Sequence, residues 1–113
     1  MKRVYISGRI TGEDLFCVVT KFDTAETLLR DQGFFPVNPL KNGLSNIATW
    51  NQHMVRDIEL LLTCDAICLL PDWQQSPGAR IEAFIANEKE MPKGYLPDNI
   101  NKQPKNLTLY RKA

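Results

Sequence analysis

Two carboxylates are candidates for chemistry because each falls among the apolar residues of an expected helix. Glu82 follows Ile81 and lies one turn before Ala86, and Asp57 lies close in angle to Met54 on the preceding helix. Spacing alone favours the ordinary interpretation of each, a surface charge for Glu82 and a half-solvated or loop-capping aspartate for Asp57. If both side chains point into one cleft instead, they can divide the roles of nucleophile and acid, as in glycoside cleavage.

Two polar segments contain the residue types that hold an anion. Residues 7–12 read Ser-Gly-Arg-Ile-Thr-Gly and combine glycines, hydroxyls and a guanidinium, which suit a phosphate group. Their glycine spacing fits neither the dinucleotide fingerprint nor the Walker loop, so the segment alone is a weak indicator. Ser76, Pro77 and Gly78 open an expected helix, where free backbone N–H groups attract an anion.

The other reactive side chains have simpler interpretations. His53 is the only histidine, which gives a zinc site poor support. Cys17, Cys64 and Cys68 are an odd number in apolar settings, and we expect buried free thiols of a cytosolic protein. Trp73 lies in a loop, where it is either a stacking platform for a base or part of a subunit contact.

The elements that must position these residues alternate between strand and helix. Apolar patterning predicts, in the order strand, helix, strand, helix, strand, helix, the ranges 4–6, 14–31, 34–38, 49–63, 65–70 and 79–90. A tail with one more strand at 107–110 follows, and Pro36 places its own strand near a sheet edge. This alternation predicts an α/β three-layer sandwich with a parallel central sheet, in which ligands bind at the carboxyl ends of the strands.

Composition sets the broad class of protein. The chain has 113 residues, a mass of 12.9 kDa and a net charge of +1, which fit one domain and disfavour a partner with a strong charge, such as a nucleic-acid polymer or a membrane surface. No apolar run approaches the roughly 18–20 residues that span a bilayer, and the first residues do not form a signal sequence. We therefore expect a cytoplasmic location.

Four features in this order resemble the nucleoside 2-deoxyribosyltransferase-like superfamily: residues 4–12, Asp57, Asp65 and the run Ser76-x-Gly78-x-x-x-Glu82. The resemblance covers about residues 3–88. It is nearest to small bacterial and phage members and, among the characterised branches, to the 2'-deoxynucleoside 5'-phosphate N-hydrolases. It implies a single domain over 1–113 with a core at about 3–88, a tail at 91–113 and a flavodoxin-like (Rossmann-like) fold. It also implies a homodimer or larger homo-oligomer, a nucleotide or nucleoside substrate, and no metal or organic cofactor.

The resemblance also implies a role for each matched residue. Glu82 corresponds to the nucleophile that attacks C1' of the deoxyribose, Asp57 to the aspartate that assists departure of the base, and Tyr5 to a tyrosine beside the sugar and the nucleophile. The contacts around the 5' end of the nucleotide fall on Gly8, Ser76 and Gly78. We also assign to substrate binding the loop and strand-end residues Ser7, Arg9, Ile10, Gly12 and Asp72.

One position bears on the substrate. The superfamily's transferases acting on free nucleosides carry an acidic residue six positions before the nucleophile, where this chain has Ser76. A carboxylate there would repel a 5'-phosphate, whereas a hydroxyl at a helix start can donate to it. Ser76 therefore favours a phosphorylated substrate, and Arg9 can add a charge-assisted contact.

We therefore expect an enzyme that cleaves the N-glycosidic bond of a 2'-deoxynucleoside 5'-monophosphate through a covalent intermediate on Glu82. Whether water or a second base accepts the sugar is left open. The chain differs from the hydrolase branch at Arg9, where a serine is usual, and at Thr11, where the arginine is usual. Two alternatives remain: a catalytically silent nucleotide sensor on the same fold, and a structural protein without a ligand.

Overall fold

The computed structural model describes residues 1–96 and the strand 109–110. Its elements, in chain order, are β1 (Arg3–Ser7), α1 (Leu15–Asp31), β2 (Phe35–Val37), the short helix η1 (Pro39–Lys41), α2 (Trp50–Leu62), β3 (Ala66–Leu69), the short helix η2 (Trp73–Gln75), α3 (Pro77–Glu88), β4 (Lys93–Tyr95) and β5 (Leu109–Tyr110). The predicted alternation of strand and helix is confirmed.

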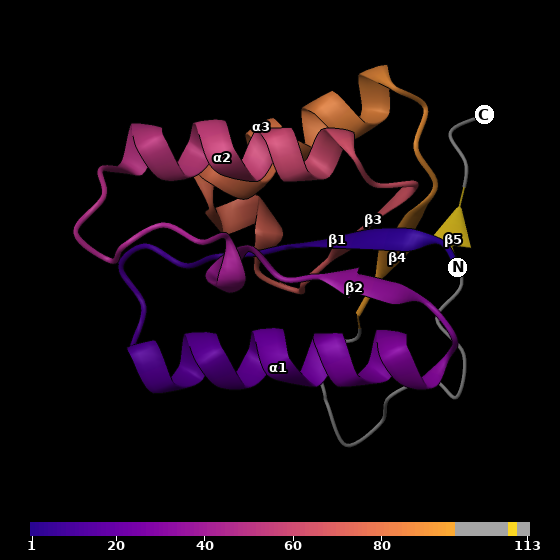
Figure 1. Cartoon of the computed structure of the whole chain (residues 1–113), viewed down its shortest axis with the longest axis horizontal. Coiled ribbons are helices and arrows are strands. Elements are labelled where there is room, and N and C mark those ends of the chain that lie inside the picture. The colour runs from indigo at the N-terminus through magenta and orange to yellow at the C-terminus, as the bar shows by residue number, and fades with distance from the viewer. Residues whose placement is uncertain (97–108, 111–113) are drawn as a thin grey trace.

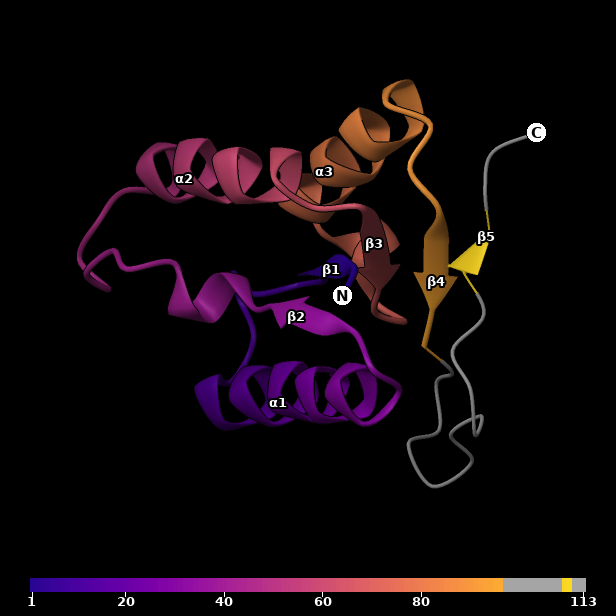
Figure 2. The same ribbon diagram turned by 45° about the vertical axis from the view of Figure 1, so that its right-hand side comes forward.

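The strands form one sheet in the order β2-β1-β3-β4-β5, in which β1 to β4 are parallel and β5 is antiparallel to β4. Helix α1 covers one face, and α2 and α3 cover the other (Figures 1 and 2). This arrangement confirms the predicted α/β sandwich of flavodoxin-like type. The chain reverses its direction of winding between β1 and β3, and in such sheets a ligand binds beside that point. Pro36 lies in β2, the edge strand, as predicted.

Alternation along β1 decides which side chains meet which helix. Val4 and Ile6 belong to the core beneath α1, whereas Tyr5 belongs to the core beneath α2 and α3. Ser7 is two residues after Tyr5 and therefore points to the same face. The strand pattern thus delivers two hydroxyl groups to the α3 side of the sheet, one at the centre of the strand and one at its carboxyl end.

Side chains at the helix starts explain where α2 and α3 begin. Thr49 and Gln52 form a capping box, in which each side chain bonds to the other residue's backbone N–H. Ser76 caps α3 by accepting the N–H of Ala79, and Pro77 occupies the first helical position, where its missing N–H costs nothing. Both helices therefore start at the end of the sheet where the site lies.

Some expectations require correction. Cys17 is exposed on α1, because its position points away from the sheet, while Cys64 and Cys68 are buried as free thiols. A strand at 93–95 was not predicted, since its three residues Lys-Gly-Tyr follow a proline and carry no strand pattern. Of the strand expected at 107–110, the last two residues are confirmed as β5, and residues 107–108 lie outside the described part.

Candidate active site

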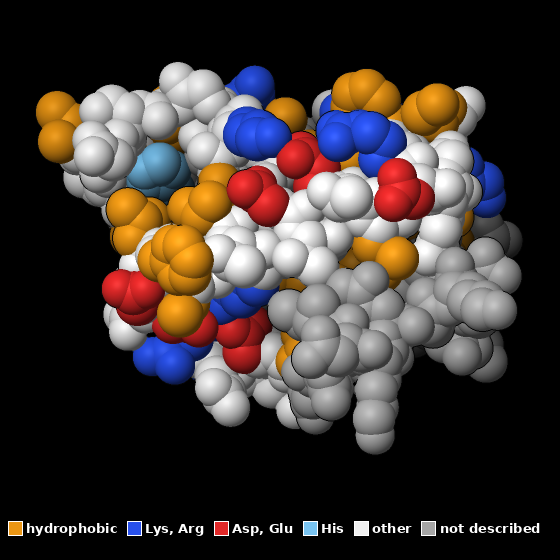
Figure 3. All heavy atoms as spheres, turned by 90° about the horizontal axis from the view of Figure 1, so that it is seen from below, with side chains coloured by type: hydrophobic (Ala, Val, Ile, Leu, Met, Phe, Trp, Pro, Cys, Tyr) orange, Lys and Arg blue, Asp and Glu red, His pale blue; other side chains and the backbone are white. Residues whose placement is uncertain are grey.

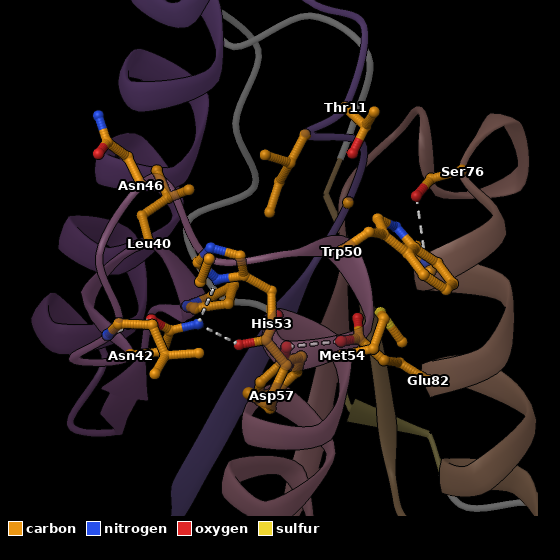
Figure 4. A pocket seen from close by; sticks show the side chains of 18 of the residues that line it. Thr11, Leu40, Asn42, Asn46, Trp50, His53, Met54, Asp57, Ser76 and Glu82 are labelled. Carbon is orange, nitrogen blue, oxygen red and sulfur yellow. Dashed lines mark hydrogen bonds between the residues drawn. The ribbon is translucent and has the colours of Figure 1, made fainter.

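A pocket of about 510 Å³ opens at the carboxyl end of the sheet (Figure 4). It is bounded by the ends of β1 and its following loop, the segment after β2, the first turns of α1 and α2, and the start of α3. Its lining residues are Tyr5, Gly8, Ile10, Thr11, Leu15, Val19, Pro39, Leu40, Asn42, Leu44, Asn46, Ala48, Trp50, His53, Met54, Asp57, Ser76, Gly78, Ala79 and Glu82. Most of the wall is apolar, and the carboxylates of Asp57 and Glu82 are its acidic groups.

Glu82 is buried, with 5% of its surface exposed. The buried residues of α3 are Ala79, Glu82, Ala83 and Ala86, whose spacing forms one helical face, while the larger Ile81 and Phe84 are exposed. The interpretation of Glu82 as a surface charge, which spacing alone favoured, is therefore wrong. Small alanines bring the helix close to the sheet, and the glutamate is the only long side chain among the buried residues of α3.

Two hydroxyl groups from β1 hold the Glu82 carboxyl group. Tyr5 Oη donates to Oε2 at 2.7 Å, and Ser7 Oγ donates to Oε1 at 2.7 Å. Within the described part of the chain, no Lys, Arg or His forms an ion pair with Glu82. Within residues 1–96, the negative charge is thus stabilised by two neutral donors, one for each oxygen.

This environment changes the acidity of both partners. Burial raises the pKa of Glu82 from its ordinary 4.5 to about 7, and the charge of Asp57 adds to the rise, while the hydrogen bonds from Tyr5 and Ser7 oppose it. Burial, together with the charges of Glu82 and Asp57, raises the pKa of Tyr5 well above 10. Tyr5 therefore stays protonated as a donor, and Glu82 changes its charge near neutral pH.

Asp57 is the second buried carboxyl group of the pocket, with 6% of its surface exposed. It shares the buried face of α2 with Met54 and Leu61, so of its two ordinary interpretations the half-solvated position is wrong and the contact with a neighbouring loop is present. Its Oδ1 accepts a hydrogen bond from Asn42 Nδ2 at 2.8 Å. Burial raises the pKa of Asp57 above its usual range, opposed by the Asn42 hydrogen bond and the nearby His53 and Arg56.

The start of α3 forms the rim of the pocket that lies across from Asp57. Ser76 Oγ accepts the Ala79 N–H at 3.1 Å, which uses a lone pair and leaves the hydroxyl hydrogen free to donate. A Cβ on Gly78 would lie 3.0 Å from the Met54 sulfur, so glycine is what allows α3 to approach α2 this closely. The rim therefore combines a hydroxyl donor with the positive end of a helix.

The structure brings most of the predicted site residues together and leaves some apart. Tyr5, Gly8, Ile10, Asp57, Ser76, Gly78 and Glu82 line the pocket, and Ser7 reaches it through Glu82. Arg9, Gly12 and Asp72 are not among its lining residues. Asp72 instead accepts the Arg9 backbone N–H at 3.0 Å and binds Lys21, which also binds Glu13, so it holds the loop after β1 in place.

Two further residues have other surroundings than a ligand site. Asp65 accepts the Arg3 backbone N–H at 2.9 Å and so joins the amino ends of β1 and β3, far along the strands from the pocket. Trp73 lies on η2 and packs against the core beneath α2 and α3. Neither lines the pocket.

Sequence reasoning missed the part of the pocket that follows β2. Asn42, Leu40 and Leu44 come from a segment whose composition indicates only a loop, and His53 was set aside because no second histidine supports a metal site. The described residues contain no group of three or more metal-binding side chains. A sequence signal for His53 does exist: it lies one turn before Asp57 on the same helix.

The chain matches the family model described as domain of unknown function DUF4406 over residues 2–93. It shares its fold with a 2-deoxyribosyltransferase from the psychrotolerant bacterium Bacillus psychrosaccharolyticus (TM-score 0.64, 16% identity, 82% of this chain and 70% of that one). It also resembles the CMP N-glycosidase of Clostridium botulinum (TM-score 0.58, 20% identity, 84% and 68%). No curated protein matches the sequence. The resemblance to the nucleoside 2-deoxyribosyltransferase-like superfamily is thereby confirmed in its fold. In the described residues, no helix is long and apolar enough to cross a membrane.

Proposed function

Since the chain belongs to the DUF4406 family, whose description names no reaction, we propose its function from the site: it cleaves the N-glycosidic bond of a 2'-deoxynucleoside 5'-monophosphate. The observation that carries the proposal is the Glu82 carboxyl group, buried at the pocket and held by two hydroxyl donors, with no cation paired to it among the described residues. The fold shared with a deoxyribosyltransferase and an N-glycosidase supports it.

In the first step, a carboxylate oxygen of Glu82 attacks C1' of the deoxyribose, and the bond from C1' to the base nitrogen breaks. The electron pair of that bond goes to the base, and Asp57, whose pKa burial raises, donates its proton to the base and becomes a carboxylate. The hydrogen bonds from Tyr5 and Ser7 fix the carboxylate so that it approaches C1' in one orientation.

In the second step, water attacks C1' and the bond to the glutamate oxygen breaks, which releases deoxyribose 5-phosphate and restores the Glu82 carboxylate. The Asp57 carboxylate takes the proton from the water. A second base in place of water would complete a transfer instead. Either acceptor enters from the side that the first base has left.

The 5'-phosphate belongs at the rim opposite Asp57. The free hydroxyl hydrogen of Ser76 and the amino end of α3 offer donors and a positive potential to an anion. Arg9 lies in the neighbouring loop, where its guanidinium is close enough to Gly12 to pack over it. We propose that the positive charge of Arg9 partly neutralises the phosphate and that Asp72 holds the loop in place.

Chromatography of the free base tests the proposal. Wild type is incubated with deoxynucleoside monophosphates, ribonucleoside monophosphates and free deoxynucleosides, in parallel with Glu82→Ala. We expect base from phosphorylated deoxy substrates with wild type only. If no substrate yields base although nucleotides raise the melting temperature, the protein is a nucleotide sensor. If no nucleotide raises the melting temperature either, the structural alternative holds.

A further inference from the structure

Asn42 is a buried loop residue whose backbone oxygen and side-chain amide both form hydrogen bonds. It is 5% exposed, its backbone oxygen accepts Arg56 Nε–H at 3.1 Å, and its side-chain Oδ1 accepts the Leu44 N–H at 3.0 Å. Because Oδ1 already has a backbone donor, the amide nitrogen must face the other way, toward Asp57 and His53. The neighbouring chain thus decides the orientation of the Asn42 amide.

The two amide hydrogens of Asn42 meet two acceptors (Figure 4). Nδ2 lies 2.8 Å from Asp57 Oδ1 and 3.1 Å from His53 Nδ1. A carboxylate oxygen can only accept, and a neutral imidazole that accepts at Nδ1 carries its own hydrogen on Nε2. The arrangement therefore selects one of the two tautomers of His53.

The Nε2 atom of His53 has no hydrogen-bond partner within the residues that the structure describes, and the side chain lines the pocket beside Asp57. In the space-filling view from below, the pale-blue histidine is visible at the surface among hydrophobic side chains (Figure 3). An unpaired N–H group in a largely apolar wall offers a directional contact to whatever fills the pocket. The His53 N–H group is a separate feature of the pocket from the Glu82 carboxyl group and from the rim at the start of α3.

Resting on the glycosidic reaction proposed above, we propose that Asn42 is a positioning residue that fixes His53 as the Nε2–H tautomer. His53 then donates a hydrogen bond from Nε2–H to the leaving base, at an atom next to the one that Asp57 protonates. The site then prefers a base with an acceptor at that place over one with a hydrogen there. The preference arises because a base that fills the pocket covers this donor, and a donor covered without an acceptor has no partner.

Matched bases make the preference concrete. Hypoxanthine has a carbonyl oxygen beside N7, where adenine has an amino group, and at N1 hypoxanthine carries a hydrogen where adenine has none. In cytosine the N3 atom beside O2 is bare, whereas in uracil it carries a hydrogen. A donor at His53 therefore favours hypoxanthine over adenine and cytosine over uracil.

The tautomer can be measured without any turnover. His53 is the only histidine of the chain, so a nitrogen–proton NMR spectrum of the labelled protein at about pH 8 reports one imidazole. We expect the Nε2–H tautomer in wild type. Asn42→Asp keeps the shape and an oxygen for the Leu44 N–H, and its second oxygen shares one proton with the Asp57 carboxylate, so toward His53 it can only accept and should draw the imidazole hydrogen to Nδ1. Asn42→Ala, a second variant in case Asn42→Asp unfolds, should populate both tautomers.

A wild-type spectrum showing Nδ1–H, or the same tautomer in all three proteins, would overturn the positioning role of Asn42. The role of His53 is tested by kcat/KM for the pair of monophosphates in the ring class that wild type accepts. We expect at least about a tenfold preference for the acceptor-bearing base, which His53→Phe removes. Equal values in wild type, or a preference that survives in His53→Phe, would refute it.

These arms separate the two proposals. If wild type releases no base from any nucleotide, the glycosidic reaction fails, and with it the role of His53 toward a leaving base, while the NMR spectra still decide the role of Asn42. If base release depends on Glu82 but shows no acceptor preference, the reaction stands and the role of His53 is refuted.

Discussion

Glu26 and Glu82 are the two buried glutamates of the described chain, with 9% and 5% of their surfaces exposed, and they lie on opposite faces of the sheet. Glu26, on α1, pairs with Lys41 at 2.8 Å and with Arg30 at 3.8 Å. Glu82, on α3, has two hydroxyl donors and a second carboxylate nearby. Burial alone therefore does not mark a reactive carboxyl group: the difference is whether cations or neutral donors compensate it.

The two glutamates also differ in their surroundings. Glu26 joins α1 to the short helix η1 through Lys41, a contact that fixes two elements. Glu82 faces the pocket, where a ligand atom can reach it. A charge neutralised by permanent partners stabilises a fold, whereas a charge without a cation can be used on a substrate.

The largest expected effect is on catalysis. Glu82→Gln keeps the size of the side chain but removes the nucleophile, so base release should fall by about 10³-fold or more. Glu26→Gln is the matched control on the other face and should retain activity within about twofold. Initial rates of base release compare the two. Equal losses in both variants would mean that Glu82 acts through folding alone.

The free energy of unfolding should change in the opposite sense to the activity: Glu82→Gln, which loses activity, should gain stability. The folded chain binds the Glu82 proton more tightly than the unfolded chain, so this contribution is fully present below about pH 4.5 and is lost as the pH rises through about 7. The loss is on the order of 3 kcal/mol. Glu82→Gln should therefore be more stable than wild type at about pH 8, and its stability should depend less on pH.

Urea denaturation at several pH values measures this difference. Glu26→Gln, the control on the other face, should lose only about 1 kcal/mol, because Lys41 and Arg30 are largely exposed. A Glu82→Gln protein with the wild-type slope would show that Glu82 is not the group that titrates.

Tyr5→Phe weakens the compensation without removing the glutamate. The Tyr5 hydrogen bond lowers the pKa of Glu82, so its loss should move that pKa above about 7 and reduce the carboxylate fraction at neutral pH. We expect a fall in kcat/KM of about 10-fold to 100-fold at neutral pH, partly recovered at higher pH. The profile of kcat/KM against pH tests this: an unshifted rising limb would separate Tyr5 from the ionisation of Glu82.

A smaller effect comes from placing a third carboxylate at the pocket rim. Ser76→Asp preserves the cap of α3, since aspartate is an equally good N-cap, but it should repel a 5'-phosphate. We expect kcat/KM for the monophosphate to fall by about tenfold, with little change for the free nucleoside. A parallel fall for both substrates would argue against a phosphate at this rim.

The same contrast shows what can be predicted from sequence. The strands and helices follow from apolar spacing, and the polar, glycine-containing nature of residues 7–12 and 76–78 follows from their composition, while their binding of a phosphate stays a prediction. The burial of Glu82 does not, because Ile81 and Phe84 are more apolar than the alanines that accompany it on the inner face. The resemblance to a superfamily, and not periodicity, singled it out.

Asn42 illustrates the other limit. Its role depends on the distances to Asp57 and His53 and on the backbone donor that orients its amide. The composition of a loop predicts none of these. Strand β4 escaped prediction for a related reason: it is a strand because β3 offers it an edge, not because Lys-Gly-Tyr favours one. Tertiary context decides both.

The proposed bond between Glu82 and C1' is tested most directly by the configuration of the sugar product. With methanol present, a methyl deoxyriboside 5-phosphate forms, and proton NMR identifies its anomer. Attack by Glu82 followed by attack by methanol inverts C1' twice, so the account predicts the β anomer, the configuration of the substrate. The α anomer would show a single displacement without a bond to the enzyme and would contradict the account.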